Sequence, residues 1–341
     1  MIFEKEEEFE KEVIEALRRC GWGELPVIEY PAEEDLLKNW AKILYDNNRS
    51  VDRLGDYLLT ESEMEQILEQ IRALKTPLKL NEFINGTISI KRDNPDDKLH
   101  FEKEISLKLY DRKEIAGGQS KYQIVRQPKF KVHSTIFNKT RRGDLMLLIN
   151  GMPLIHIELK RSNVPVSEAY NQIEKYAHES VFTGLFSLIQ IFAAMTPDET
   201  VYFANPGPDG KFNKDFYFHW ADFNNELINE WDKVVENLLS IPMAHQLIGF
   251  YTIADNTDGI LKVMRSYQFY AARAISDKVA SENDWNGKNR LGGYIWHTTG
   301  SGDQTNIHIT AQSSTTFSAY VYRIEGTASG TRYLQWIAIG Y

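Results

Sequence analysis

The sequence predicts an α/β protein in which a mixed sheet flanked by helices follows a helical N-terminal layer. Three observations support this fold class. Residues 1–80 carry apolar side chains at helical spacing, residues 80–205 contain short apolar or alternating runs, and a helical segment at 167–176 interrupts those runs. The chain has 341 residues, of which 42% are hydrophobic, and this is enough for a sizeable buried core.

The N-terminal layer is predicted from apolar residues that recur every three or four positions and so share one helical face. These residues are Phe9, Val13, Ala16 and Leu17, then Leu37, Trp40 and Leu44, then Met64, Ile67, Leu68 and Ile71. Thr60 and Glu63 stand three positions apart before the last group, a spacing typical of a capping box. We therefore expect a layer of helices before the first strands.

Strands are expected where short apolar or alternating runs occur. These runs are Thr87–Ile90, Tyr122–Val125, Leu145–Ile149 and Leu154–Leu159. The apolar run Leu185–Met195 has about half the length that a membrane span needs and contains Gln190. It predicts a buried strand around Leu188–Ala193 and gives no reason to expect a membrane protein.

Composition restricts the compartment and the partners. Cys20 is the single cysteine, and the acidic start of the chain lacks the regions of a signal peptide, so we expect a cytoplasmic protein. The net charge of −9 argues against a protein that coats nucleic acid. Residues 121–142 nevertheless contain seven Lys or Arg and no acid, which predicts either a local DNA contact or a solvated basic face. The candidate DNA contacts are Lys129, Lys131, Arg141 and Arg142.

Three regions are expected along the chain. Turn residues at Asn205–Gly210 predict that a first domain spans residues 1–210. Residues 211–302 have a more helical pattern. Residues 303–341 form an atypical tail rich in Ser, Thr and Tyr, which suits either a small β element or a disordered segment.

The chemical pattern of greatest interest is a predicted hairpin in which Asn150-Gly151 joins two apolar strands. Asp144 precedes the first strand, and Glu158 and Lys160 lie on the second. Because side chains alternate along a strand, His156, Glu158 and Lys160 share one face. Burying such charges is costly unless they serve each other or a metal ion.

The register of this hairpin decides whether the two carboxylates meet. A three-residue loop would pair Asp144 with Glu158, whereas a two-residue loop would pair Asp144 with Ile157. A β-bulge would correct the second case. The sequence therefore predicts an odd loop or a bulge.

Two carboxylates held together repel each other, and Mg²⁺ would relieve that repulsion because it prefers oxygen ligands. The metal would also lower the pKa of a bound water and neutralise charge on a phosphate, and Lys160 would hold that water or stabilise the pentavalent phosphate. The alternative is an edge hairpin in which Asp144 and Glu158 are solvated and Lys160 merely pairs with one of them.

Gln172 and Tyr176 lie four positions apart, on one face of the helix expected at 167–176. With the preceding carboxylates and lysine, they resemble the nuclease motif and the Gln-x-x-x-Tyr element of PD-(D/E)xK enzymes. Residues 142–205 resemble the nuclease domain of the restriction (R) subunit of type I restriction-modification enzymes. The resemblance implies a PD-(D/E)xK core in which Asp144, Glu158 and Lys160 are catalytic.

The same resemblance implies Mg²⁺ as cofactor and double-stranded DNA as substrate. It also implies partners, the methyltransferase and specificity subunits of a type I complex. A carboxylate of the first helix often joins such sites, and Glu8 or Glu12 could supply it. Spacing does not choose between these two, and solvated acids on a helix face are the alternative.

The resemblance further implies that a RecA-like helicase motor, which uses ATP, follows the nuclease. Residues 265–271 resemble its adenine-reading motif, and residues 292–302 resemble the approach to its phosphate-binding loop. The implied nucleotide contacts are Gln268, Thr299, Gly300, Ser301 and Gly302. Such a loop continues with Lys and then Ser or Thr, but this chain has Asp303 and Gln304. We therefore expect the motor homology to be interrupted near 302, and we do not expect ATP hydrolysis.

Three functions remain open from the sequence. The first is the Mg²⁺-dependent endonuclease domain of a type I restriction enzyme, with the translocase part truncated. The second is a stand-alone repair-type nuclease of the PD-(D/E)xK class. The third is a catalytically silent fragment that binds DNA or assists assembly.

Overall fold

The computed structural model describes residues 2–50, 52–110, 120–132, 139–207, 210–254 and 259–281, together with strand residues 294–298, 304–311 and 317–324. The chain divides into two compact units, Met1–Trp220 with Ile228–Met264 and Ala221–Leu227 with Arg265–Tyr341. These units divide the chain at other positions than the boundaries expected near 210 and 302. Within the described residues, no helix is long and apolar enough to cross a membrane.

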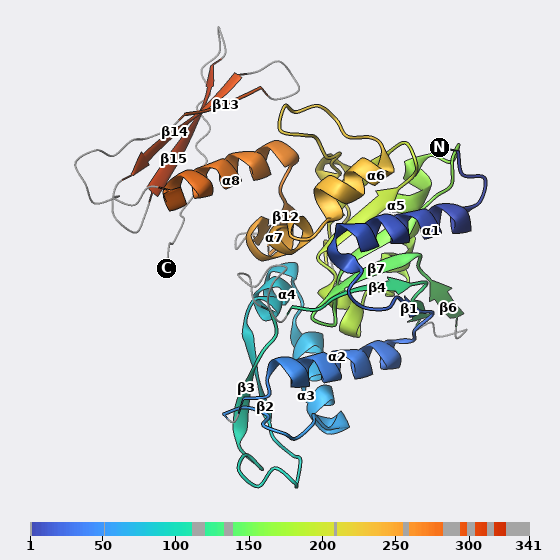
Figure 1. Cartoon of the computed structure of the whole chain (residues 1–341), viewed down its shortest axis with the longest axis vertical. Helices are drawn as coiled ribbons and strands as arrows, with labels where there is room; N and C mark the ends of the chain where they lie inside the picture. The colour runs from blue at the N-terminus through green and yellow to red at the C-terminus, as the bar shows by residue number, and fades with distance from the viewer. Residues whose placement is uncertain are drawn as a thin grey trace. The chain divides into compact units, whose positions relative to one another are not determined.

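The first unit opens with the predicted helical layer (Figure 1), which consists of α1 (Glu6–Leu17), α2 (Glu33–Asn47), α3 (Glu61–Ala73) and α4 (Pro77–Ile84). The capping box at the start of α3 is confirmed. The Thr60 hydroxyl accepts from the Glu63 backbone N–H at 3.1 Å, and the Glu63 carboxylate accepts from the Thr60 N–H at 2.9 Å. These two bonds satisfy donors that a helix start otherwise leaves unpaired.

The core of the first unit is a six-stranded mixed sheet, which confirms the predicted α/β class. Its strands in spatial order are β1 (Ile28–Glu29), β4 (Tyr122–Arg126), β7 (Leu145–Ile149), β8 (Met152–Leu159), β9 (Ile191–Met195) and β10 (Thr200–Ala204). The pairs β1–β4 and β8–β9 are parallel, and the other pairs are antiparallel. All residues of β7 and β8 are buried, so both faces of these strands are covered, and this explains their nearly continuous apolar sequence.

The buried strand predicted around Leu188–Ala193 is confirmed as β9, but it begins at Ile191 and ends at Met195. Residues Gly184–Leu188, at the start of the apolar run, form a 3₁₀ helix instead. Gly184 has a φ of 57°, and the Ser187 hydroxyl donates to the Gly184 carbonyl at 2.8 Å. A local turn therefore precedes the strand.

The turn between β7 and β8 has the two-residue form expected for Asn-Gly. Ile149 pairs with Met152, and Asn150 and Gly151 have φ values of 53° and 81°. Positive φ at both positions is what a type I′ turn requires. A side chain at Gly151 would also place its Cβ 2.9 Å from the Cα of Trp40 on α2, so only glycine fits there.

A β-bulge follows this turn. It confirms the prediction that a two-residue loop needs a bulge to bring Asp144 and Glu158 to the same face. The register shifts between Leu147 and Leu148, so β8 has one residue more than β7 over this stretch, at Leu154. The continued register brings Asp144 opposite Glu158. The two carboxylates therefore reach the same side of the hairpin.

Further elements surround the sheet. The ribbons are β2 (Thr87–Lys91) with β3 (Glu104–Lys108), β5 (Lys129–Val132) with β6 (Lys139–Arg142), and β11 (Thr252–Ala254) with β12 (Leu261–Val263). The helices are α5 (Val166–His178), α6 (Trp231–Val234) and α7 (Met243–Phe250), with a 3₁₀ turn at Lys214–Phe216 and π-type turns at Arg18–Trp22 and Val235–Leu239. The helix predicted at 167–176 is confirmed as α5.

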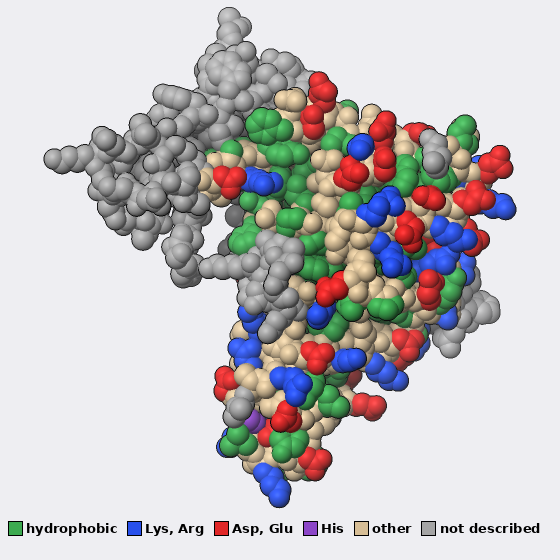
Figure 2. Space-filling view, viewed as in Figure 1, with side chains coloured by type: hydrophobic (Ala, Val, Ile, Leu, Met, Phe, Trp, Pro, Cys, Tyr) green, Lys and Arg blue, Asp and Glu red, His purple; other side chains and the backbone are tan. Residues whose placement is uncertain are grey.

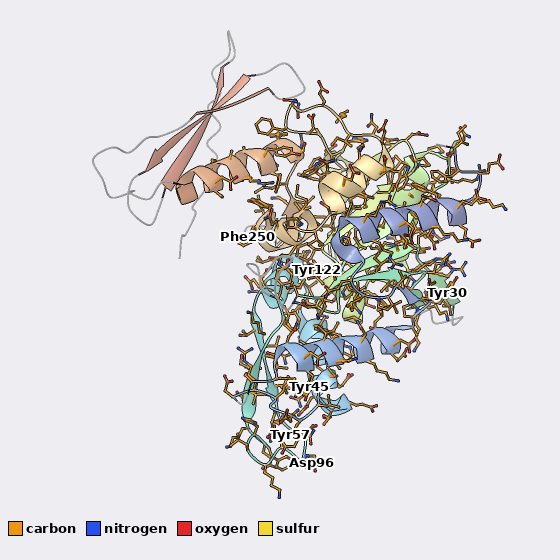
Figure 3. All side chains as sticks on the ribbon, in the orientation of Figure 1. Tyr30, Tyr45, Tyr57, Asp96, Tyr122 and Phe250 are labelled. Carbon is orange, nitrogen blue, oxygen red and sulfur yellow. The ribbon has the colours of Figure 1, made fainter. Side chains whose placement is uncertain are left out.

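Residues 228–264 belong to the first unit because their backbone and side chains bond to its core. Tyr122 on β4 is buried within the molecule (Figure 3), and its hydroxyl lies 2.9 Å from Nδ1 of His245 on α7. The Trp22 indole donates to the Leu239 carbonyl at 2.7 Å. These bonds connect segments more than 120 positions apart, a distance at which sequence periodicity carries no information.

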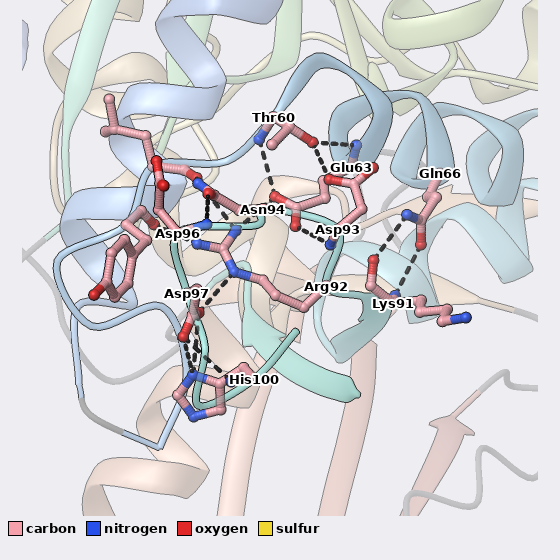
Figure 4. Close-up of polar contacts among 12 residues, drawn as sticks. Thr60, Glu63, Gln66, Lys91, Arg92, Asp93, Asn94, Asp96, Asp97 and His100 are labelled. Atoms are coloured by element: carbon pink, nitrogen blue, oxygen red, sulfur yellow. Dashed lines mark hydrogen bonds and ion pairs between the residues drawn. The ribbon is translucent and has the colours of Figure 1, made fainter. Parts of the chain in front are cut away.

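A buried ion network holds the β2–β3 ribbon against α3 (Figure 4). The Arg92 side chain is fully buried and donates to Glu63 at 2.6 Å and to Asp97 at 2.9 Å. Its Nη1 and Nη2 groups also donate to the carbonyls of Leu58 and Tyr57, respectively. Because these four bonds hold a fully buried charge, the network fixes the ribbon, and removal of one acid would leave part of that charge unpaired.

The second unit contains α8 (Ser266–Ser281) and an antiparallel sheet of β13 (Tyr294–Thr298), β14 (Gln304–Ala311) and β15 (Phe317–Ile324). Strands β14 and β15 lie in the Ser, Thr and Tyr-rich tail. Of the two structures expected for that tail, a small β element or a disordered segment, residues 304–311 and 317–324 adopt the β structure.

Candidate functional site

The hairpin β7–β8 brings the predicted carboxylates together. Glu158 is fully buried, and Asp144 is partly buried. The Leu159 backbone N–H donates to Oδ2 of Asp144 at 2.7 Å, which fixes Asp144 beside the strand that carries Glu158. The alternative of a solvated edge hairpin is wrong, because β7 and β8 are interior strands.

Lys160 completes the predicted group on the same face of β8. Its Nζ lies 3.8 Å from Oε1 of Glu158 and donates to the Leu159 carbonyl at 2.8 Å. A second acid, Glu6 of α1, has Oε1 3.7 Å from the same Nζ. One ammonium group therefore faces several acids, and it cannot neutralise all of them.

Burial dominates the electrostatics of these two acids. Burial, reinforced by the Glu158 charge, raises the pKa of Asp144 well above its usual value. Burial also raises the pKa of Glu158 to about 8, although Lys160 opposes that shift. Oε1 of Glu158 is buried and has no hydrogen-bond partner among the described residues. In the absence of a cation, both acids tend to retain protons.

His156 lies on the same strand face, two positions before Glu158. Its Nε2 is 3.3 Å from Oε2 of Glu158, and the imidazole is fully buried. Burial lowers the pKa of His156 to about 4, with the Asp144 charge and the Leu145 backbone opposing the shift, so the ring is neutral at neutral pH. The alternation of side chains along the strand predicted this placement, but the sequence assigned no role to His156.

The first helix contributes a different acid from those predicted. Glu8 and Glu12 are exposed, whereas Glu6 contacts Lys160. Another acid of the helix, Glu10, is buried in an ion pair with Arg126. Acidic residues occupy several turns of this helix, so spacing in the sequence could not single out the acid beside the site.

The sequence model of the family described as type I restriction enzyme R protein N terminus matches residues 3–211. The chain belongs to this family. Among curated relatives, type I restriction enzyme endonuclease subunits of Staphylococcus saprophyticus and Staphylococcus aureus (strain COL) are 34% and 32% identical over 302 residues. The aligned residues are 89% of this chain but 29% of each relative, so the chain spans less than a third of their length. The EcoprrI endonuclease subunit of Escherichia coli is 28% identical over 286 residues, which are 82% of this chain and 83% of that protein.

In this R-protein N-terminal domain, Gln172 and Tyr176 support the segment that leads to Asp144. Gln172 donates to the Tyr176 hydroxyl at 2.6 Å, and that hydroxyl donates to the Arg142 carbonyl at 2.8 Å. Burial, reinforced by the Glu158 charge, raises the pKa of Tyr176, so the hydroxyl keeps its proton and can donate. The pair therefore anchors the chain two residues before Asp144.

The candidate DNA contacts of the R-protein domain lie on the ribbon β5–β6. Lys131 forms an ion pair with Glu34, and Arg141 forms one with Glu179. Lys129 and Arg142 face each other across the ribbon and are exposed. Neither has an ion-pair partner among the residues that the structure describes. Figure 2 shows acidic and basic side chains interspersed over the visible face of the molecule, so any basic contact surface on it is local.

The predicted nucleotide contacts can be placed only in part. Thr299, Gly300, Ser301 and Gly302 lie outside the described residues. The side-chain oxygen of Gln268 accepts from the Arg265 backbone N–H at 3.0 Å. In this arrangement Gln268 caps the start of α8.

Proposed function

We propose that this domain is the Mg²⁺-dependent nuclease of a type I restriction enzyme and that it hydrolyses phosphodiester bonds of duplex DNA at Asp144, Glu158 and Lys160. One observation carries the proposal. The bulge in β8 brings Asp144 to the side of the hairpin that carries Glu158, and Oε1 of Glu158 is buried with no hydrogen-bond partner in the described part of the chain and only the Lys160 ammonium 3.8 Å away. Such an orphan oxygen is costly unless it serves a ligand.

The donor set suits Mg²⁺. Both candidate ligands are carboxylates, and burial raises the pKa of each, so a bound cation that favours their charged forms would offset this shift. Within the described residues, no group of three or more His, Cys, Asp or Glu side chains could hold a metal ion by itself. That agrees with Mg²⁺, which usually keeps several waters and takes oxygen atoms from a bound phosphate.

The bound ion would supply Lewis-acid stabilisation of phosphate charge and a more acidic water. Asp144 and Glu158 would hold it, and the Leu159 N–H keeps Asp144 beside Glu158. Lys160 lies 3.8 Å from Glu158, and its ammonium would donate to a phosphate oxygen or to the attacking water. Glu6 takes the position predicted for an acid from the first helix and orients Lys160.

DNA is proposed to approach along the ribbon β5–β6. Lys129 and Arg142 are its exposed basic pair, and Arg142 stands two residues before Asp144. Phosphate contacts by such residues position a duplex without reading its sequence. Base preference is accordingly assigned to the specificity subunit, with the methyltransferase subunit as the other partner. We also propose that the sequence at 299–304 does not support ATP hydrolysis, because Asp303 stands where a phosphate-binding lysine is needed.

Cleavage of supercoiled plasmid tests the proposal. The purified chain, alone and with methyltransferase and specificity subunits, is incubated with and without Mg²⁺. Asp144→Ala should abolish Mg²⁺-dependent cutting, whereas the control Asp215→Asn, which changes an exposed acid, should cut normally.

Equal cutting by the Asp144→Ala variant and the wild-type protein would show that the site assignment is wrong. Cutting without partner subunits would favour the stand-alone nuclease. Absence of cutting under every condition would favour a silent DNA-binding or assembly fragment.

A further inference from the structure

His156 occupies an unusual position for a fully buried histidine. Its ring packs against Phe130 and Phe182, with centroid distances of 6.0 and 5.6 Å, yet its Nε2 points at a carboxylate oxygen of the candidate metal site. Nδ1 has no hydrogen-bond partner among the described residues. The ring has two polar neighbours, the Leu145 backbone, which opposes the lowering of the His156 pKa by burial, and the Glu158 carboxylate, which lies in hydrogen-bonding geometry to Nε2.

We propose that His156 is a positioning residue whose Nε2–H donates to Oε2 of Glu158 and thereby leaves Oε1 as the oxygen available to the metal ion. This inference rests on the proposed nuclease function and names a residue that sets the geometry of its metal ligand. An ionised carboxylate only accepts hydrogen bonds, so with the metal bound the neutral imidazole has to be the donor.

The terminal torsion of a glutamate is broad, so the carboxylate of Glu158 needs an external anchor to present one defined oxygen. Lys160 does not provide it, because its Nζ is 3.8 Å from Oε1, beyond normal hydrogen-bond length. The contact from His156 at 3.3 Å acts on the opposite oxygen. Groups that hydrogen-bond to a metal ligand commonly orient it in this way.

Gly143 links this anchor to the other carboxylate. A Cβ at Gly143 would lie 2.6 Å from Cε1 of His156 and 2.9 Å from the ring of Phe130. The backbone immediately before Asp144 thus touches the imidazole that supports Glu158. A side chain that only filled space could replace the ring in the aromatic cluster, but it could not replace the hydrogen bond to Glu158.

Calorimetric titration of the full chain with Mn²⁺ or Mg²⁺ alone tests the role without requiring DNA cleavage. His156→Leu removes the donor, and His156→Gln keeps an N–H near the position of Nε2. The matched control is His245→Leu, which removes another fully buried imidazole, on α7. We expect His156→Leu to weaken metal binding about 10- to 100-fold, His156→Gln to restore most of it, and His245→Leu to leave it unchanged.

The Asp144→Asn variant distinguishes a failure of the proposed metal site from a failure of the proposed role of His156. If this variant binds metal as tightly as the wild type, the proposed metal site is wrong. If it loses binding while His156→Leu retains it, or if the Leu and Gln variants lose it equally, only the role of His156 is overturned. Should His156→Leu fail to fold, ¹⁵N NMR of the histidines in the Mg²⁺-loaded wild-type chain decides the matter. A tautomer with Nε2 protonated and Nδ1 unprotonated supports the inference, and the tautomer with Nδ1 protonated overturns it.

Discussion

Replacing Glu158 by Gln should stabilise the metal-free protein at alkaline pH. Burial raises the pKa of Glu158 from 4.5 to about 8. Between these values the unfolded chain releases a proton that the folded protein retains, so the free energy of unfolding falls as pH rises through this window and levels off above it. Glutamine has no such proton, and Glu158→Gln therefore removes this loss while keeping the size of the side chain.

The magnitude follows from the size of the pKa change. Each pKa unit is worth about 1.4 kcal/mol, so the rise at Glu158 sets an upper bound of about 5 kcal/mol. Local relaxation and water entry after ionisation reduce the penalty of a buried charge. We expect Glu158→Gln to gain about 2–5 kcal/mol over the wild type at pH 9, relative to the difference at pH 5.

Urea unfolding followed by tryptophan fluorescence in EDTA measures this difference at both pH values. Glu168→Gln, which changes an exposed acid of α5, is the control and should show the same difference from wild type at each pH. Added Mg²⁺ should stabilise the wild type at pH 9 but not Glu158→Gln, because a ligand stabilises only the state that binds it. A Glu158→Gln difference that does not change with pH would refute the assignment of a raised pKa to this buried acid.

Two further predictions concern the supports of the site. Tyr176→Phe removes the hydroxyl that donates to the Arg142 carbonyl, so we expect a loss of about 1–3 kcal/mol in urea unfolding and about tenfold slower plasmid cleavage. Unchanged cleavage would mean that the Gln172–Tyr176 pair does not support Asp144. Lys129→Ala and Arg142→Ala should each lower the slope of log DNA affinity against log salt by about 1, as measured by fluorescence anisotropy. The Lys131 ammonium already pairs with Glu34, so Lys131→Ala should lower the slope less. An equal decrease would argue against Lys129 and Arg142 as the main phosphate contacts of the ribbon.

Much of the site could be predicted from local sequence patterns. Alternation along a strand placed His156, Glu158 and Lys160 on one face, and Asn150-Gly151 marked the turn between the two strands. Because side chains alternate between the two faces of a strand, Asp144 and Glu158 could share a face only if the loop had an odd number of residues or one strand had a bulge. These inferences succeeded because each depends on the geometry of a few consecutive residues, which is nearly independent of the rest of the protein.

Other features depend on residues far apart in the chain, and the sequence could not decide them. The acids Glu6, Glu8 and Glu12 look alike in the sequence, and only the packing of α1 brings Glu6 to Lys160. Likewise, Lys131 resembles Lys129 until the fold brings Glu34 beside it.

The sequence by itself therefore determined the fold class, the hairpin and the choice of Asp144, Glu158 and Lys160 as candidate residues. Only the tertiary structure decided that β7 and β8 lie inside the sheet, where Glu158 is fully buried. The physical reason is that periodicity reports which face a side chain occupies, whereas burial depends on the elements that cover that face. Burial raises the pKa of Glu158, and this buried carboxylate beside Asp144 and His156 is the basis on which we propose a metal site.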